Sequence, residues 1–383
     1  MAKPGTNTKP DRAGIRAAPV PWSQPANADE LLNDLTQVFA QYLVLPPGAA
    51  EAIALWVLFT HAFEAFDVSP RLALLSPLPE CGKTTLLTLL SHLVLKALVA
   101  SNVSPAVIFR VIERDRPTLL LDEADTYIED RNDYNGILNS GHTRGAAIIV
   151  RARKSGDDYV PMTYSTWAPI VIAKIGKLSA TLASRSIIIP MRRKRPSETV
   201  TRFRQSQDAA SLDEFASKCA RWAKDHLAAL KGADPSMPAG LNNRTADNWR
   251  PLFAIAELAA GNWPNKARNA ALALANDESE VTEAEELLVD ISQVQKTFGG
   301  DRIASQVLCD KLNALDDRPW CALNNGRGLT QNGLSKLLRD FLIKPQTIRI
   351  GSTTPKGYMW VDFQDAFARY LPSNRNTATS PTN

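Results

Sequence analysis

The sequence has few cysteines, no long apolar run and almost no net charge. Its four cysteines, Cys81, Cys219, Cys309 and Cys321, form neither a CxxC pair nor a Cys/His spacing typical of zinc sites. This excludes a disulfide-stabilised scaffold and a zinc finger. No stretch approaches the roughly 20 apolar residues that cross a bilayer, and the N-terminus lacks the apolar segment of a signal peptide. The formal net charge of +4 also excludes a polycation, so we expect a soluble, cytoplasmic protein without a membrane partner.

The 383 residues, 44% of them apolar, suffice for two or three domains. The proline-rich start and the Ser/Thr/Asn-rich end are predicted to be disordered tails, because neither can bury enough apolar surface to offset the entropy of ordering. The regions between them differ in pattern and predict four structural parts. The predicted boundaries are a tail at 1–28, N-terminal helices at 29–69, an ATPase core at 70–195, a helical lid at 196–298, a C-terminal domain at 299–371 and a tail at 372–383.

Short apolar runs alternate with helical stretches in the predicted core. Such alternation indicates an α/β fold, in which helices cover both faces of a parallel sheet. The runs that we expect to form strands are Leu72–Leu75, Ala97–Ala100, Thr118–Leu121, Ala147–Val150, Ile170–Ala173 and Ile187–Ile189.

A candidate phosphate-binding loop follows the first of these strands. A P-loop has the pattern GxxxxGK[ST] between a strand and a helix, and Gly82, Lys83 and Thr84 match its end. Pro77 stands where the first glycine belongs, but proline can also make a tight turn, with φ fixed and one donor fewer. The alternative is a chance GKT triplet at a helix start. The pattern assigns Lys83 to the phosphates of ATP and Thr84 to Mg²⁺, and the other predicted ATP-binding residues of the loop are Pro77, Glu80, Cys81, Gly82 and Thr85.

An apolar strand ending in two carboxylates gives the loop a partner. In a Walker B motif the first carboxylate, here Asp122, holds Mg²⁺ and the second, Glu123, acts on the attacking water. The alternative is a buried strand followed by a solvated acidic turn. Residues 122–125 also spell DEAD, but the second arginine-rich domain of DEAD-box helicases is missing from the sequence, so we reject that assignment.

Four basic residues could complete this site. Arg185 directly precedes the last predicted strand, where many oligomeric ATPases place a catalytic arginine finger aimed at the neighbouring subunit; the alternative is a surface arginine capping a strand. Arg244, or else Arg250, could sense the nucleotide from the predicted lid. Lys174, at the end of a strand, occupies the usual polar sensor position.

Two basic segments are candidate DNA sites. A predicted strand–turn–strand segment around residues 151–158 resembles the pore hairpin of ring helicases, against the alternative of a solvated hairpin. A predicted helix over 331–342 with Thr330 as its N-cap, followed by strands at 347–350 and 358–360, indicates a winged helix, which could bind DNA or protein. We expect His142 to be a hydrogen-bonded core or surface histidine. The predicted DNA contacts are Arg144, Arg151, Arg153, Lys154, Lys336, Arg339, Arg349 and Lys356.

Several motifs together resemble one known family. Pro117–Asp125, Leu138–Gly145, Leu182–Ile189 and Arg244–Leu252 look like segments of an uncharacterised-domain family of AAA+-like ATPases. That family is carried by phages, plasmids and genomic islands, often fused or adjacent to primases. The resemblance spans roughly residues 30–371. It implies an AAA+-type P-loop sheet followed by a helical lid and a winged-helix-like domain.

The function that this resemblance implies is that of a replicative DNA helicase of a mobile element. Its cofactors would be ATP and Mg²⁺, its substrate single-stranded or forked DNA, and its assembly a homo-hexamer, with a primase as a candidate partner. Two alternatives stay open: a regulatory or anti-phage defence ATPase that remodels a partner without unwinding DNA, and an inactive nucleotide-binding scaffold.

Overall fold

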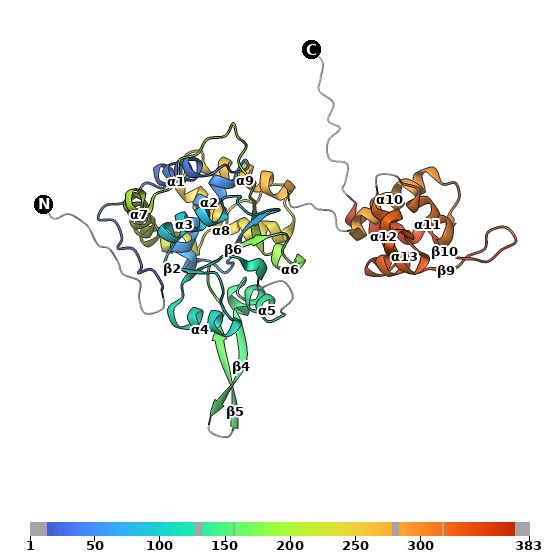
Figure 1. Ribbon diagram of the computed structural model, residues 1–383, viewed down its shortest axis with the longest axis horizontal. Helices are drawn as coiled ribbons and strands as arrows, with labels where there is room; N and C mark the ends of the chain where they lie inside the picture. Colours follow the sequence, from blue (N-terminus) through green and yellow to red (C-terminus); the bar gives the residue numbers. More distant parts are fainter. Residues whose placement is uncertain (1–13, 127–131, 156–157, 278–282, 316–317, 372–383) are drawn as a thin grey trace, which may run out of the picture. The chain divides into compact units, whose positions relative to one another are not determined.

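The computed structural model describes residues 14–126, 132–155, 158–277, 283–315 and 318–371. The chain divides into two compact units, residues 1–278 and 279–383 (Figure 1). Within the described residues, no helix combines the length and apolarity that a membrane span requires.

Five parallel strands form the central sheet of the first unit. Their order is β2-β3-β6-β1-β7, and all their pairings are parallel. Both faces of the sheet are covered, which explains the continuous apolar runs in the sequence. The strands are β1 (Arg71–Ser76), β2 (Ala97–Ala100), β3 (Thr118–Leu121), β6 (Ile170–Ile175) and β7 (Ser186–Pro190). The predicted α/β class is therefore confirmed.

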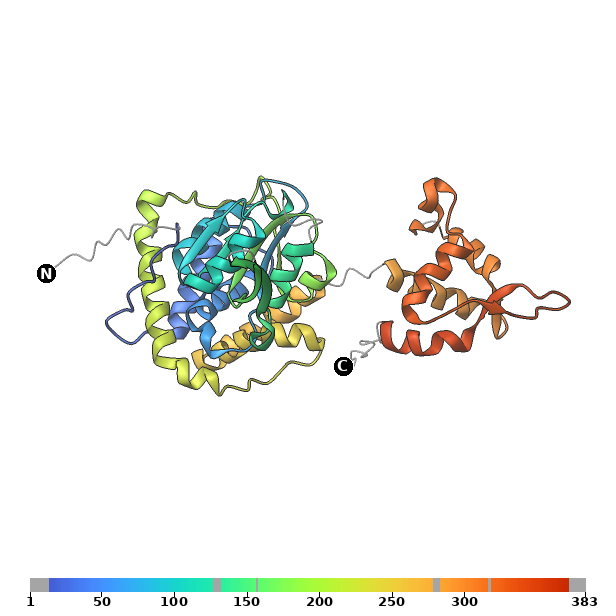
Figure 2. The ribbon, with the colours of Figure 1, turned by 90° about the horizontal axis from the view of Figure 1, so that it is seen from below.

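Alternate residues of the strands point into two different cores. Val171 and Ala173 of β6 belong to the larger core, whereas Ile170 and Ile172 pack into a smaller one on the other face. Helices cover both faces in this unit (Figures 1 and 2). The larger core includes α1 (Ala28–Tyr42), α2 (Ala49–Ala62), α3 (Lys83–Leu93), α7 (Gln205–Lys231), α8 (Asn243–Ala259) and α9 (Trp263–Asp277). The smaller core includes α4 (Pro105–Asp115), α5 (Asn132–Ser140) and α6 (Ala180–Ala183).

The helices predicted as one lid over residues 196–298 are divided differently in the structure. α7, α8 and α9 contact α2, and their apolar side chains share one core with the sheet. α2 is apolar on every side, and Ala52 to Phe59 are fully buried, as expected for a helix surrounded by others. Figure 2 shows α7 lying along the side of this unit. α10 (Glu283–Thr297) belongs to the second unit.

Part of the predicted N-terminal tail is ordered by hydrogen bonds. The backbone N–H of Arg16 donates to the Ala97 carbonyl oxygen at 2.9 Å, and its guanidinium pairs with Asp213 of α7. The N–H of Trp22 donates to the Ser217 oxygen at 2.9 Å. The prediction of disorder is therefore wrong for residues 14–27, because backbone and side-chain hydrogen bonds to β2 and α7 hold this segment. Residues 1–13 and the predicted tail at 372–383 lie outside the described residues.

The predicted strand at 147–150 belongs to a separate hairpin and not to the parallel sheet. β4 (Ile148–Ser155) pairs antiparallel with β5 (Asp158–Ser165), from Ile148 opposite Ser165 to Ser155 opposite Asp158. The hairpin extends away from the sheet (Figure 1). The prediction of two adjacent strands is confirmed, with residues 156–157 between them outside the described residues, whereas the assignment of 147–150 to the sheet is wrong.

The second unit combines helices with a small antiparallel sheet of order β8-β10-β9. Thr330 accepts a hydrogen bond from the Gly333 N–H, so the predicted N-cap is confirmed. The predicted helix ends at Leu338, because Arg339–Phe341 form a 3-10 turn and Leu342 takes a positive φ of 62°. The elements are α10, β8 (Arg302–Ala304), α11 (Ser305–Asn313), α12 (Leu323–Gly326), α13 (Gln331–Leu338), β9 (Gln346–Thr347), β10 (Lys356–Met359) and α14 (Gln364–Tyr370).

Candidate functional site

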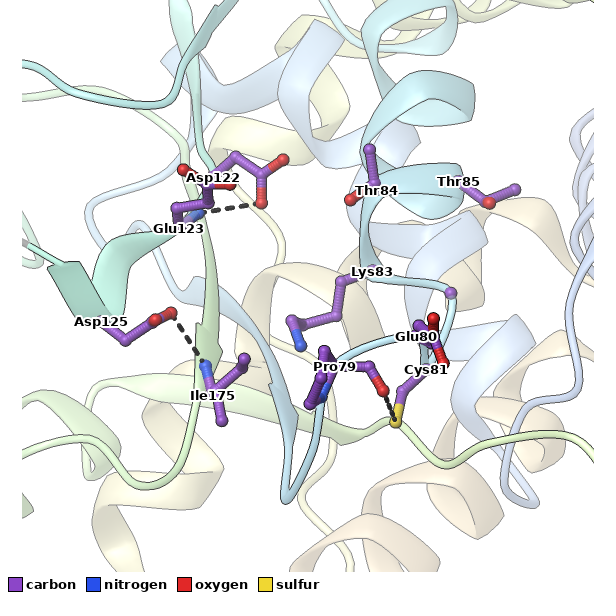
Figure 3. A pocket seen from close by; sticks show the side chains of 11 residues that line it. Pro79, Glu80, Cys81, Lys83, Thr84, Thr85, Asp122, Glu123, Asp125 and Ile175 are labelled. Carbon is purple, nitrogen blue, oxygen red and sulfur yellow. Dashed lines mark hydrogen bonds between the residues drawn. The ribbon is translucent and has the colours of Figure 1, made fainter.

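A pocket of about 580 Å³ lies at the carboxyl ends of β1, β3 and β6 (Figure 3). The loop between β1 and α3 forms one side, and the residues that follow β3 form the other. These two segments are far apart in sequence and meet because parallel strands present their carboxyl ends at the same edge of a sheet. The lining residues are Pro79, Glu80, Cys81, Gly82, Lys83, Thr84, Thr85, Asp122, Glu123, Asp125 and Ile175.

Gly82 fixes the turn into α3. Its φ is +84°, and a Cβ there would lie 3.0 Å from Leu43 Cδ2, so a larger residue would be strained in both backbone and packing. The 11-residue helix α3 begins at the next residue, Lys83. The first backbone N–H groups of a helix have no partner within it and carry partial positive charge. The loop can therefore present both N–H donors and the Lys83 ammonium to an anion.

Lys83 is held at the start of the loop. Its ammonium donates to Ser76 Oγ, and that hydroxyl donates to the Leu78 carbonyl oxygen at 2.7 Å. Cys81 Sγ also contacts the Leu78 oxygen, at 3.2 Å. These bonds orient the lysine toward the pocket, on the side opposite the carboxylates (Figure 3). Pro77, which replaces the first glycine of the motif, is not among the lining residues.

The acidic side of the pocket is ordered by hydrogen bonds to β2 and β6 and by one local bond. The Asp122 N–H donates to the Ala100 oxygen at 2.9 Å, and Asp122 Oδ1 accepts from the Glu123 N–H at 2.9 Å. Glu123 has a positive φ of 50°, which is uncommon for a residue with a side chain. Asp125 Oδ1 accepts from the Ile175 N–H at 3.1 Å and so ties this segment to β6.

The pocket has the ligand types for Mg²⁺ but not a complete protein shell. Among the described residues, no group of three or more His, Cys, Asp and Glu side chains could hold a metal. Mg²⁺ in nucleotide sites commonly takes one or two protein oxygens and completes its octahedron with phosphate oxygens and water. Thr84 and Asp122 fit that role, and the loop fits the phosphates.

Sequence reasoning missed Arg193. Its Nε donates to the Pro79 oxygen at 3.0 Å, and its guanidinium lies 3.2 Å from the Glu80 carboxylate. β7, which precedes Arg193, pairs with β1, and the chain therefore returns beside the loop. The basic run 192–195 was a visible signal, but its contact with the loop depends on strand order.

The remaining predicted nucleotide contacts do not line the pocket. Lys174 is buried on β6, and its neighbour Ile175 lines the pocket instead. Arg250 forms an ion pair with Asp234 at 2.6 Å. Arg185 precedes β7 at the amino end of the sheet, opposite the pocket. Burial, and then repulsion from nearby Arg244, lower the pKa of Arg185. Arg244 therefore does not reach the pocket of its own chain.

Asn248 of α8 clamps the segment that carries Arg185. Its Nδ2 donates to the Ser184 oxygen at 3.1 Å and to the Ser186 oxygen at 3.5 Å. His142 Nε2 in turn donates to Asn248 Oδ1 at 2.7 Å, which confirms the expectation of a hydrogen-bonded histidine. Arg244 lies one helical turn before Asn248, so the contact of Asn248 with Ser184 and Ser186 also brings Arg244 beside Arg185.

Burial and nearby arginines lower the pKa of His142 to about 4, and burial lowers the pKa of His61 to about 4. An unfolded histidine titrates near 6.5, so the unfolded state binds more protons at mildly acidic pH. We therefore expect stability to fall as the pH decreases from about 6.5 toward 4, by about 1 to 2 kcal/mol per histidine at pH 5. Urea unfolding at pH 7 and pH 5 measures this loss. A His142→Gln variant should lose less stability on acidification than the parent protein, and an equal loss would contradict the assignment.

Arg144, one of the predicted DNA contacts, binds other residues of the fold. Its guanidinium donates to the Glu64 carboxylate at 3.0 Å and to the Phe66 oxygen at 3.0 Å. It also lies 4.8 Å from the centre of the Trp167 ring. These contacts join the segment after α5 to the end of the N-terminal helices. The other predicted DNA-contacting residues on both units are exposed: Arg151, Arg153, Lys154, Lys336, Arg339, Arg349 and Lys356.

The fold and the site thus define a mixed α/β protein with a polar pocket at the carboxyl edge of a parallel sheet. Residues 190–370 match a family described as "Protein of unknown function (DUF3631)". The chain is 38% identical over 188 residues to an "Uncharacterized 28.9 kDa protein in xis 5'region" of Saccharopolyspora erythraea, an alignment that covers 48% of this chain and 69% of the relative. The chain belongs to the same family as that protein. These two matches confirm the expected membership of an uncharacterised-domain family.

Solved structures of the NrS-1 C-terminal region also resemble the chain. One, an A form apo structure, has a TM-score of 0.40 at 10% identity and covers 89% of this chain and 76% of its own. Another apo structure has a TM-score of 0.41 at 13% identity, with 92% and 79% covered.

Proposed function

We propose that the protein is an AAA+-type P-loop ATPase that moves on or unwinds DNA. The observation that carries the proposal is the meeting of Lys83 and Thr84 with Asp122 and Glu123 in one pocket. A chance GKT triplet would not be expected to face a pair of carboxylates from another strand. The alternative of a solvated acidic turn is also disfavoured, because both carboxylates line this pocket.

The strand order supports a ligand site at this edge. The strands that follow β1 in sequence lie on both sides of it: β2, β3 and β6 on one side and β7 on the other. The order of the strands therefore changes direction at β1. Ligands of open α/β sheets bind outside the carboxyl ends of the strands at such a point. The pocket lies there.

Bound ATP with Mg²⁺ would supply the phosphoanhydride bond whose hydrolysis powers movement. Lys83 and the backbone N–H groups at the start of α3 would bind the phosphates, while Thr84 and Asp122 would hold the metal. Glu123 would orient the attacking water and accept its proton. ATP binding and phosphate release by the purified protein test these roles.

Arg185 would complete the site of a neighbouring subunit. The pocket and Arg185 lie at opposite ends of the sheet, so one chain cannot bring them together. Head-to-tail contacts, in which the Arg185 end of one subunit meets the pocket of the next, close into rings. We therefore propose a ring, with six subunits as the family resemblance implies, in which Arg185 acts as an arginine finger.

DNA would bind to exposed basic side chains on both units. The β4–β5 hairpin carries Arg151, Arg153 and Lys154, and a hairpin that projects from each subunit can line the centre of a ring. The second unit combines helices with a three-stranded sheet, which supports a winged-helix assignment and contact with duplex or forked DNA. DNA-stimulated ATP hydrolysis and strand displacement on a fork test the motor. Hydrolysis without either effect would favour an ATPase that remodels a protein partner.

Replacing Arg151, Arg153 and Lys154 with alanine is expected to weaken single-strand binding and flatten its salt dependence. Each phosphate contact contributes about 0.7 to the slope of log K against log salt for single strands, so the slope should fall by up to about 2. Fluorescence anisotropy of a labelled oligothymidylate at several salt concentrations measures it. Basal ATP hydrolysis should persist, because the pocket residues are unchanged.

The matched control removes the same charge from the second unit. Replacing Lys336, Arg339 and Arg349 with alanine should leave the single-strand slope largely unchanged and weaken binding to duplex or forked DNA. A lower slope in this control, together with a parental slope in the hairpin variant, would contradict the hairpin assignment and locate the single-strand site in the second unit.

A further inference from the structure

A second concave site lies between α4 and the hairpin. This groove, about 440 Å³ in volume, is lined by Arg110, Arg151, Ala152, Arg153, Lys154 and Tyr164. Four of its six lining residues are basic and none is acidic. The nearest described acid that pairs with one of them is Asp133, 3.5 Å from Arg151.

The hairpin is attached to α4 by a hydrogen bond and a ring contact. Glu113 of α4 accepts a hydrogen bond from the Ser165 N–H at 2.6 Å. The Phe109 and Tyr164 rings lie 4.8 Å apart at an interplanar angle of 52°. These contacts hold the two walls at a fixed separation, so the groove is a built feature of the first unit and not a gap between mobile parts.

The strand register orders the groove from apolar to basic. Directly opposed residues of an antiparallel pair share one face. Tyr164 lies opposite Ile149, and the next residues of β4 on that face are Arg151 and Arg153. α4 adds Arg110, whose guanidinium carbon lies 5.7 Å from the centre of the Phe109 ring. An aromatic ring and basic residues from two separate elements thus line the same groove.

We infer that this groove binds a single strand of nucleic acid, with Arg110 contacting a phosphate and Tyr164 supporting a base. A basic groove that follows the backbone, combined with an aromatic platform, is the composition of single-strand sites. Duplex DNA is read by elements that protrude into its grooves, whereas this site is concave. The inference rests on the DNA binding proposed above and extends it to α4, which sequence reasoning had not included.

The test measures binding of a labelled 20-nucleotide oligothymidylate to the full chain without ATP. Arg110→Gln should lower the salt slope by about 0.7, the value of one phosphate contact. Arg114→Gln is the matched control, because Arg114 lies one turn further along α4, pairs with Asp115 and does not line the groove. The inference is overturned if Arg110→Gln retains the parental slope, or if both variants change it equally.

Tyr164 provides the second arm. Tyr164→Leu should weaken binding roughly 5- to 150-fold, the range for loss of one stacked base, whereas Tyr164→Phe keeps the ring and should bind as the parent does. Tyr159→Leu controls for loss of a hairpin tyrosine, since Tyr159 is 65% exposed and outside the groove. If Tyr164→Leu fails to fold, the Arg110 comparison decides. Arg110→Gln should leave binding to a blunt duplex of the same length unchanged, and an equal loss of affinity for the duplex and the oligothymidylate would also overturn the single-strand assignment.

This test is independent of ATP hydrolysis. A protein that binds the oligonucleotide as described but does not bind ATP would contradict the ATPase proposal alone. A protein that hydrolyses ATP but shows no Arg110 or Tyr164 effect would contradict the groove alone.

Discussion

Mixing Arg185→Ala subunits with Lys83→Ala subunits should restore part of the ATP hydrolysis that each variant lacks alone. An arginine finger contributes on the order of 10³-fold or more to the rate, so the Arg185→Ala protein should be nearly inactive. In a mixed ring, some interfaces pair an intact pocket with an intact arginine. Phosphate release measured across mixing ratios should therefore pass through a maximum.

The geometry around Arg185 makes this experiment informative. The Arg185 guanidinium donates to the Thr181 oxygen at 2.7 Å. Asn248 donates to the carbonyl oxygens of Ser184 and Ser186, the residues on either side of Arg185. Arg250→Ala is the control on α8: its side chain forms an exposed pair with Asp234, and exposed pairs contribute little to stability. That variant should keep near-parental activity. No recovery in demonstrably mixed oligomers would show that Arg185 does not act on a neighbouring pocket.

Lys83→Ala should abolish ATP binding, whereas Glu123→Gln should keep binding and stop hydrolysis. The lysine would contact the phosphates in the ground state, but the glutamate would act on water only during the reaction. Binding of a fluorescent ATP analogue and phosphate release measure the two effects separately.

Lys96→Ala is the control for the lysine. Lys96 Nζ donates to the Asp115 oxygen at 3.4 Å, away from the pocket, so this variant should bind ATP normally. Parental hydrolysis by Glu123→Gln would contradict the role of Glu123. Parental ATP binding by Lys83→Ala would contradict the P-loop assignment and favour a scaffold.

The parts of the fold that sequence predicted are those set by local pattern. The five sheet strands are continuous apolar runs, and most of the pocket residues directly follow two of them. Predicting these strands therefore also predicted where the pocket lies. The strand at 147–150 was misassigned because a short apolar run does not reveal which strand it pairs with. Its hydrogen bonds go to β5 and not to the sheet.

The parts that sequence could not predict depend on distant partners. A basic residue looks the same in sequence whether it faces solvent or carbonyl oxygens, and Arg144 proved to be bound to Glu64 and Phe66. Arg193 contacts the loop only because β7 lies beside β1. Residues 14–27 are held by backbone and side-chain hydrogen bonds to distant residues such as Asp213 and Arg221, for which composition carries no signal.

The burial of α2 has a consequence for how the chain is synthesised. This helix ends at Ala62, but α8 and α9, which contact it, end at Ala259 and Asp277. At about 5 to 20 residues per second, a ribosome needs roughly 10 to 40 s to add the intervening residues. During that interval α2 has no complete apolar surroundings, and contacts between distant residues form slowly. We therefore expect a fragment that ends before α9 to expose apolar surface of α2 and to aggregate.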